Sequence, residues 1–159
     1  ATIKEIGLLD YVMSHPEDYT YVDRSLAKND QEAREYHAKN ILSDYYLMSS
    51  NAFTADGQLI NIDGNGNRVS CLCFGPKHVI IVVSMNKMCA DVEDAYRRIR
   101  QDACPPNALR LNLDTPCAKT GYCAECTSTS SICASFVTTR MSRYPGRIKV
   151  ILVGEPLGF

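Results

Sequence analysis

The sequence has no long apolar run and no excess of charge of either sign. Its longest continuous apolar run, Val79–Val83, is far shorter than the roughly 20 residues that a membrane-spanning helix needs. The 17 Lys and Arg residues nearly balance the 18 Asp and Glu residues, giving a net charge of −1. This excludes a sequence-wide attraction to polyanions. We therefore expect neither a nucleic-acid partner nor a membrane.

Several short signals are also missing. Residues 1–14 lack the charged and apolar layout of a signal peptide, which predicts a cytoplasmic protein with reduced thiols. Neither a G-x-G-x-x-G motif nor a P-loop occurs. The three histidines, His15, His37 and His78, are scattered and have no obvious catalytic partner. What remains is the composition of a soluble globular protein, 159 residues long and 45% hydrophobic, that fits one domain.

Helical and strand patterns alternate along the chain. This order predicts an α/β fold with a mainly parallel sheet flanked by helices. The expected helices cover residues 2–15, 30–42, 69–74 and 90–103, the last one ending at Pro105-Pro106. The expected strands cover residues 19–22, 44–50, 59–62, 78–84, 136–140 and 147–153.

Ligands of such sheets collect at the carboxyl ends of the strands. The loops expected there are 49–56, 63–68 and 84–87, all rich in Asn, Gly, Ser, Asp or Lys. Backbone N–H groups of the Gly64-Asn65-Gly66-Asn67 loop, together with Arg68, can bind an anion, and Lys87 follows the most apolar strand. A plain turn that uses Gly and Asn for positive φ explains the same loop.

Four of the eight cysteines fall in one short polar segment with the spacing C-x5-C-x2-C-x6-C, as Cys117, Cys123, Cys126 and Cys133. An Fe–S cluster needs about four thiolates from a loop that can wrap around it. Structural zinc sites usually use two C-x2-4-C knuckles, and only one is present. Disulfides or free thiols remain open alternatives. We favour an Fe–S cluster, with zinc as its main competitor.

The surroundings of these four cysteines supply two further expectations. Lys119, Arg140 and Arg143 lie nearby in the sequence and can offset the negative charge of a cluster. The other four cysteines are expected to be small buried hydrophobic residues: Cys71, Cys73, Cys89 and Cys104.

Several segments together resemble one known family, the LUD domain, which is associated with lactate utilisation. They are residues 51–68, 74–82 and 145–154, Met85-Asn-Lys87, Pro105-Pro-Asn-Ala, Thr115-Pro-Cys117 and the terminal Gly-Phe. The resemblance runs through the whole chain and is to the stand-alone, cysteine-bearing branch of anaerobic bacteria. It implies a fold like that of glucosamine-phosphate isomerase, ribose-phosphate isomerase and the CoA transferases.

The resemblance also implies a domain organisation. Residues 1–159 are expected to form a single LUD-like domain, with a cysteine-rich loop at 115–134 before the last strands. Family members carry upstream helices and a Gly-Gly-Ser-type loop before the position of Thr2, so we expect part of the N-terminal region to be missing.

Residues 49–68 also resemble the active-site strand–turn–strand of methylthioribose-phosphate isomerase. An acidic residue transfers a proton there, at the position that Asn51 occupies in this chain. Because a neutral amide cannot act as a general base, we expect Asn51 to bind a ligand instead.

The resemblance implies a role in the redox metabolism of a small organic acid such as lactate, whereas the cysteine spacing alone suggests only a metal centre. The expected partners are a small anionic metabolite and a redox partner protein, and a homo-oligomer is left open. The alternatives are a sugar-phosphate or acyl isomerase or transferase, and a ligand-binding regulatory domain, with zinc or no metal. The predicted anion site is Asn51, Gly64, Asn65, Gly66, Asn67, Arg68 and Lys87. The predicted ligands of a 4Fe–4S cluster are Cys117, Cys123, Cys126 and Cys133.

Overall fold

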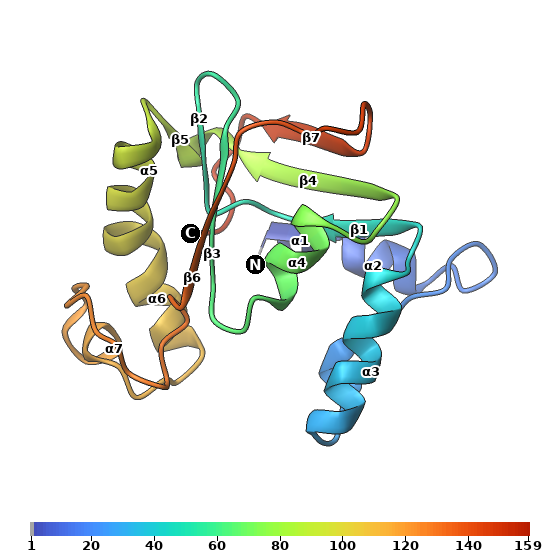
Figure 1. Ribbon diagram of the computed structural model, residues 1–159, viewed down its shortest axis with the longest axis horizontal. Coiled ribbons are helices and arrows are strands. Elements are labelled where there is room, and N and C mark those ends of the chain that lie inside the picture. Colours follow the sequence, from blue (N-terminus) through green and yellow to red (C-terminus); the bar gives the residue numbers. More distant parts are fainter. Residues whose placement is uncertain (1) are drawn as a thin grey trace.

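The apolar strand β4 (His78–Ser84) lies at the centre of a parallel sheet, where its side chains are covered on both faces. It pairs with β1 (Tyr45–Met48) on one side and with β7 (Ile148–Val153) on the other. Figure 1 shows this sheet in a computed structural model that describes residues 2–159. The predicted α/β class with a parallel sheet is confirmed.

A second sheet of four short strands lies against the first, in the order β5-β2-β3-β6. It consists of β5 (Met88–Cys89), β2 (Ala52–Thr54), β3 (Leu59–Asp63) and β6 (Ser135–Thr139). The β2–β3 hairpin and the β3–β6 pair are antiparallel, and β5 is parallel to β2. The residue pattern did not predict strand β2, because a three-residue strand is too short to detect, but the resemblance of residues 49–68 to a strand–turn–strand did imply this hairpin. The β3–β6 pair was not predicted.

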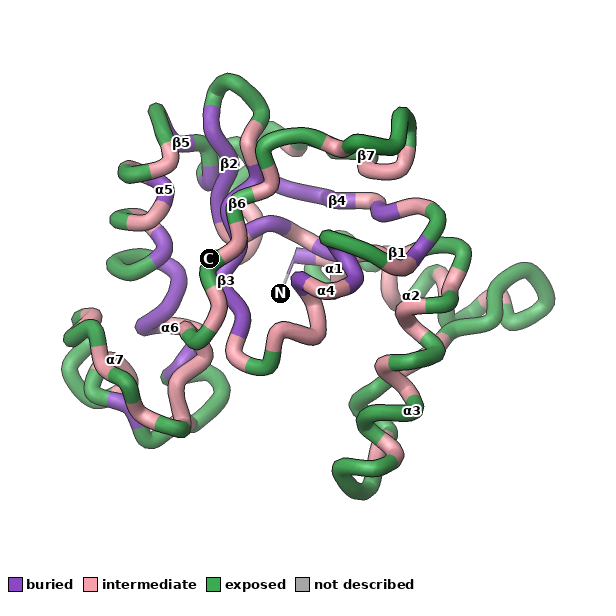
Figure 2. The backbone as a smooth tube through the Cα atoms, viewed as in Figure 1, coloured by how far each residue is buried: buried purple, intermediate pink, exposed green. Residues whose placement is uncertain are grey.

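The β2–β3 hairpin separates two hydrophobic cores. Successive side chains of a strand point to opposite faces, so Ala52 and Ile60 face one core and Phe53 and Leu59 face the other. Figure 2 shows both strands buried in the middle of the molecule. The first core is completed by helix α5 (Val92–Arg98), and the second by strand β4 and helix α4 (Asn67–Cys73).

The N-terminal region departs from two predictions. The single helix expected after Thr2 is divided into α1 (Thr2–Glu5) and α2 (Leu8–Met13), because Gly7 between them is left-handed, with φ 71°. The strand predicted at residues 19–22 is wrong: this mostly exposed segment has no strand partner within residues 2–159. Helix α3 (Asp30–Ile41) forms where it was predicted, and it has no buried residue.

The helix predicted over residues 90–103 does not stop at the two prolines. Helix α5 widens into the π-helical turn η3 (Ile99–Ala103) and continues as α6 (Cys104–Arg110). Proline is tolerated in the first turn of a helix because its missing N–H needs no partner there. Pro105 and Pro106 therefore lie in the first turn of helix α6, and the helical region continues to Arg110.

The remaining short elements are the turns η1 (Arg24–Leu26) and η2 (Met85–Lys87) and helix α7 (Pro116–Thr120), which lies inside the cysteine-rich loop. Within residues 2–159, no helix is both long and apolar enough to cross a bilayer. Strand β7 is an exposed sheet edge, with half of the Ile151 side chain accessible to solvent.

Replacing Ile60 by alanine is expected to lower the free energy of unfolding by about 2–5 kcal/mol, because Ile60 is fully buried in the first core. Denaturant unfolding measures the change. The matched control is Ile151→Ala, where the side chain is 50% exposed and the loss should be much smaller. Equal losses in the two variants would contradict the placement of the core.

Candidate functional site: an anion pocket beside a thiol cavity

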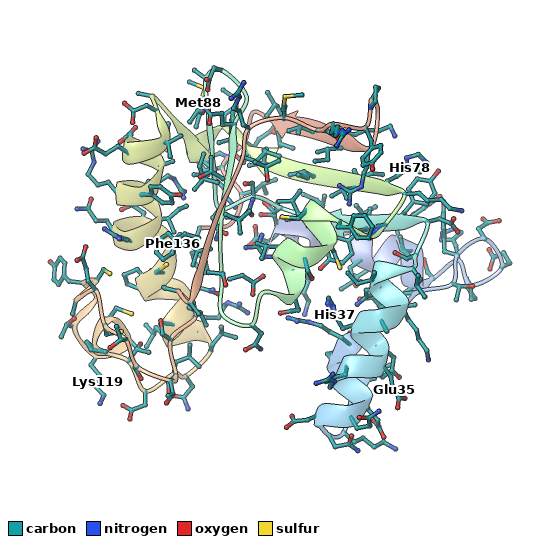
Figure 3. All side chains as sticks on the ribbon, in the orientation of Figure 1. Glu35, His37, His78, Met88, Lys119 and Phe136 are labelled. Carbon is teal, nitrogen blue, oxygen red and sulfur yellow. The ribbon has the colours of Figure 1, made fainter. Side chains whose placement is uncertain are left out.

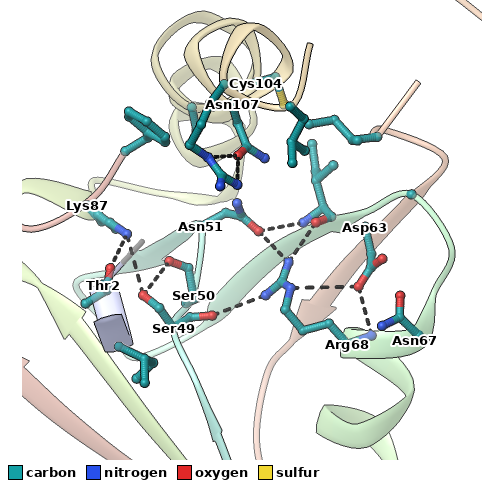
Figure 4. Close-up of a pocket in the computed structure, with 18 of the residues that line it drawn as sticks. Thr2, Ser49, Ser50, Asn51, Asp63, Asn67, Arg68, Lys87, Cys104 and Asn107 are labelled. Atoms are coloured by element: carbon teal, nitrogen blue, oxygen red, sulfur yellow. Dashed lines mark hydrogen bonds and ion pairs between the residues drawn. The ribbon is translucent and has the colours of Figure 1, made fainter. Parts of the chain in front are cut away.

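A pocket of about 400 Å³, called here the anion pocket, opens where strands β1, β3 and β4 end (Figure 4). The three loops predicted at the strand ends therefore do meet. The pocket is lined by five of the seven residues predicted for an anion site, Asn51, Gly64, Asn67, Arg68 and Lys87. The other two, Asn65 and Gly66, do not line it.

The Arg68 guanidinium joins the elements around the pocket. Its Nη1 donates to the Ser49 carbonyl (3.2 Å) and to Asn61 Oδ1 (2.6 Å). Its Nη2 donates to Asn51 Oδ1 (2.8 Å) and to the Ile62 carbonyl (2.7 Å). Four of its five N–H donors thus bind other groups of the protein (Figure 4). The main role of Arg68 is therefore to hold the pocket wall together, and few of its donors are left for a ligand.

The Gly/Asn loop is folded around the carboxylate of Asp63. This carboxylate accepts hydrogen bonds from the backbone N–H groups of Asn65, Gly66, Arg68 and Val69, at 3.1–3.2 Å. It also lies 3.7 Å from Arg68 Nε. Two of the N–H groups that the sequence suggested for an external anion, those of Asn65 and Gly66, therefore bind an internal one, and they fix the edge of the pocket.

The two ends of the Asn51 amide have different roles, because the oxygen holds the pocket wall and the nitrogen faces the pocket. Its Oδ1 accepts from both Arg68 and the Ile62 N–H (3.0 Å), and the amide nitrogen points into the pocket in Figure 4. The side chain can therefore donate a hydrogen bond to a ligand, which is the binding role that the sequence suggested.

Lys87 is the predicted cation that is most available to a ligand. Its Nζ lies in the pocket near Thr2 Oγ1 (3.3 Å) and Ser49 Oγ (3.5 Å), and only 3% of the residue is exposed. Burial, followed by the positive charge of Arg98, lowers its pKa to about 8. A bound anion would compensate this buried charge.

The structure adds pocket residues that sequence reasoning missed. Arg24 comes from η1, and Asn107 and Arg110 come from α6. Asn107 Oδ1 accepts from Arg110 Nη2 at 2.7 Å. No sequence pattern placed Arg110 at the site, because the helix was expected to end at the prolines. With these residues the pocket has more cationic than anionic side chains.

A second cavity of about 120 Å³, called here the thiol cavity, lies within the cysteine-rich loop. All four predicted ligands line it, Cys117, Cys123, Cys126 and Cys133, and a fifth thiol, Cys104, joins them from α6.

The other expectations for the cysteines are met in part. All eight cysteines are free thiols, and Cys71, Cys89 and Cys104 are buried as expected. The expectation is wrong for Cys73, which is exposed, because the short helix α4 turns this residue away from the core that holds Leu72.

The sulfur atoms of the thiol cavity have close polar neighbours. Cys133 Sγ lies 3.4 Å from Cys104 Sγ, and Cys117 Sγ lies 3.3 Å from the Thr115 hydroxyl. The contact between Cys104 and Cys133 lowers the pKa of Cys133 to about 7, whereas the same contact and burial raise the pKa of Cys104. Cys133 is therefore the thiol of this pair that ionises first.

The cation beside this cavity is not one of those suggested by the sequence. Arg100 lines the thiol cavity and pairs with Glu125 at 2.8 Å. Lys119 instead pairs with Asp114, and neither Arg140 nor Arg143 lines the cavity.

The donor set can be tested against the predicted metal centres. Within residues 2–159, no three His, Cys, Asp or Glu side chains are gathered around one point as ligands of a single ion. Five thiols instead surround a cavity. Thiolates are the ligands of both Fe–S clusters and structural zinc, so the chemistry of these donors fits either predicted centre.

The two cavities share a wall. Cys104 and Ile132 line both the anion pocket and the thiol cavity. Gly64 lies directly against this wall: a Cβ atom added there would come within 3.2 Å of Ile132 Cα. The Gly/Asn loop and the cysteine-rich loop therefore touch, and the absence of a side chain at Gly64 permits this close approach.

Comparison with known proteins identifies the family. The family model of the LUD domain matches residues 1–153. The chain belongs to the LUD domain family. No curated protein and no solved structure was found to match it. The family predicted from the sequence motifs is thus confirmed, and the anion pocket and thiol cavity are features of a LUD domain.

Replacing Arg68 by lysine should lower the free energy of unfolding on the order of 3 kcal/mol. One ammonium group cannot reach the four acceptors that the guanidinium holds, and partly buried oxygens would lose their partners. Denaturant unfolding measures the loss. The control Arg97→Lys changes an exposed arginine paired with Asp94, where a change within about 0.5 kcal/mol is expected.

Proposed function

We propose that this LUD-domain protein binds a small organic acid anion and takes part in its redox metabolism, using an Fe–S cluster in the thiol cavity. The observation that carries the proposal is the shared wall: Cys104 and Ile132 separate a cation-lined pocket from a cavity lined by five thiols. A ligand in the first would lie beside a redox centre in the second.

Binding of an anion is supported by the charges of the pocket. Lys87 follows strand β4 and Arg110 comes from helix α6, and the Asn51 amide points into the pocket as a hydrogen-bond donor (Figure 4). The partly enclosed setting strengthens their attraction to a carboxylate or phosphate, because charges interact more strongly away from bulk water. Arg68 and Asp63 hold the wall in place while these groups bind.

The cysteine-rich loop would hold the cluster. The four loop thiols and Cys104 are the available donors, and Arg100 beside them offsets negative charge. A bound cluster would supply one-electron transfer. Passing electrons onward requires a redox partner protein, which is part of this proposal.

A second candidate is supported by one observation. Lys87, with a pKa of about 8, is a pocket group that can exchange a proton near neutral pH. It would allow an isomerase- or transferase-type enzyme that acts on a sugar phosphate or acyl substrate, with zinc or no metal in the cysteine-rich loop. This candidate uses only the anion pocket. It does not require the pocket to lie beside the thiol cavity.

Protein purified without oxygen is expected to contain about four iron and about four acid-labile sulfide atoms per chain, as a 4Fe–4S cluster requires. Metal analysis and a sulfide assay measure both. Stoichiometric zinc without iron would contradict the redox proposal and favour the second candidate.

Affinity for an anionic probe should be nearly constant below pH 8 and fall above it. Lys87 has a lowered pKa of about 8 in the free pocket, so above this pH it must take up a proton before it can bind an anion. Calorimetric titration with L-lactate and with 3-phosphoglycerate between pH 6 and pH 10 measures the profile.

Two variants test this assignment. Lys87→Met should lower the affinity roughly 10- to 100-fold at pH 7, the loss expected for a charged hydrogen bond, and should flatten the decline above pH 8. Lys77→Met removes an exposed lysine paired with Asp44 outside the pocket. It should leave the affinity at pH 7 and the decline above pH 8 unchanged. An unaltered pH profile in Lys87→Met would contradict the role of Lys87.

A further inference from the structure

We propose that Cys104, from helix α6, is a ligand of the cluster together with Cys117, Cys123 and Cys133, and that Cys126 is not. The inference rests on the proposed function, since it assigns the thiolates of the cluster proposed there. It changes one of the four ligands that the cysteine spacing suggests, and it moves that ligand out of the loop and onto the wall of the anion pocket.

The position of Cys104 supports this assignment. Its Sγ lies 3.4 Å from Cys133 Sγ, and both residues line the thiol cavity. Cys104 reaches this cavity from helix α6, outside the cysteine-rich loop that carries the other four thiols.

The contacts of the sulfur atoms separate Cys126 from the other four thiols. Cys117 Sγ contacts the Thr115 hydroxyl, Cys123 Sγ accepts from the Glu125 N–H at 3.5 Å, and Cys133 Sγ contacts Cys104. Hydrogen bonds to ligand sulfurs stabilise and tune Fe–S clusters. No hydrogen bond reaches Cys126 Sγ within residues 2–159.

The backbone supports Cys104 as well. Cys104 belongs to the first hydrophobic core and is 4% exposed, so its position is fixed by packing before any metal binds. Cys126 lies in an irregular part of the loop, directly after Glu125, whose φ is +50°. A ligand on a packed helix loses less conformational freedom on binding than one on an irregular loop.

A ligand at position 104 would also explain how the two sites are joined. Cys104 lines the anion pocket as well as the thiol cavity (Figure 4). With Cys104 bound to iron, the cluster would lie against the wall that the organic anion touches, with no further side chain needed between them.

Reconstitution of the full chain with ferrous iron and sulfide under anaerobic conditions tests the assignment. Wild type, Cys104→Ala, Cys126→Ala and the control Cys73→Ala, which removes an exposed thiol outside the cavity, are compared by bound iron, acid-labile sulfide and, after one-electron reduction with dithionite, electron paramagnetic resonance. Cys126→Ala and Cys73→Ala should keep the iron content of wild type, and Cys104→Ala should lose more than half of it.

Retention of iron by Cys104→Ala, or its loss from Cys126→Ala, would overturn the inference while leaving the proposed function intact. A wild-type chain that binds no iron would overturn both. If thermal unfolding shows that Cys104→Ala does not fold, Cys104→Ser decides: oxygen bound to iron changes the resonance spectrum, whereas an unchanged spectrum would show that Cys104 is not a ligand.

Figure 3 shows two further side chains near the cysteine-rich loop, Phe136 and Lys119. Phe136 lies on β6 and Lys119 on α7, on the same side of the molecule as helix α6. Phe136 lines the thiol cavity and Lys119 does not. The cavity thus has one aromatic side chain on the side of the second sheet.

Discussion

The hydrogen bonds of the Arg68 guanidinium are the interaction on which the rest of the site depends. They connect the end of β1, through Ser49, to Asn51 before β2 and to Asn61 and Ile62 of β3. Burial lowers the pKa of this guanidinium, yet its ordinary value is so high that the charge remains. A flexible lysine could not satisfy these oxygens in one plane, which is why arginine suits this position.

The arrangement has a consequence for the chemistry of the pocket. Asp63 and Arg68 neutralise each other and are saturated by internal hydrogen bonds, so the net charge that a ligand meets comes from Lys87, Arg24 and Arg110. The groups that fix the geometry are therefore separate from the groups that bind. Such a division lets a pocket hold its shape before the ligand arrives, which limits the entropy lost on binding.

Much of the fold could be predicted from patterns in the sequence. The apolar run of β4 identified the centre of the parallel sheet, and the polar loops after β1 and β4 meet because parallel strands end at the same edge. The loop after β3 was expected there for the same reason, but it reaches the pocket from the antiparallel pairs of the second sheet. The spacing of the four loop cysteines likewise identified the segment that forms the thiol cavity. Both signals are local, and local hydrogen bonding and hydrophobicity decide them.

Other features required tertiary contacts. Residue patterns and motifs were enough to predict the α/β class, the family and the segment rich in thiols. The folded chain was needed to show that the helix continues past Pro105 after a π-helical turn, that Cys104 faces the loop cysteines, and that Asp63 fills the Gly/Asn loop. Each of these features depends on residues distant in sequence or on a backbone irregularity. No periodic pattern in the sequence records such contacts.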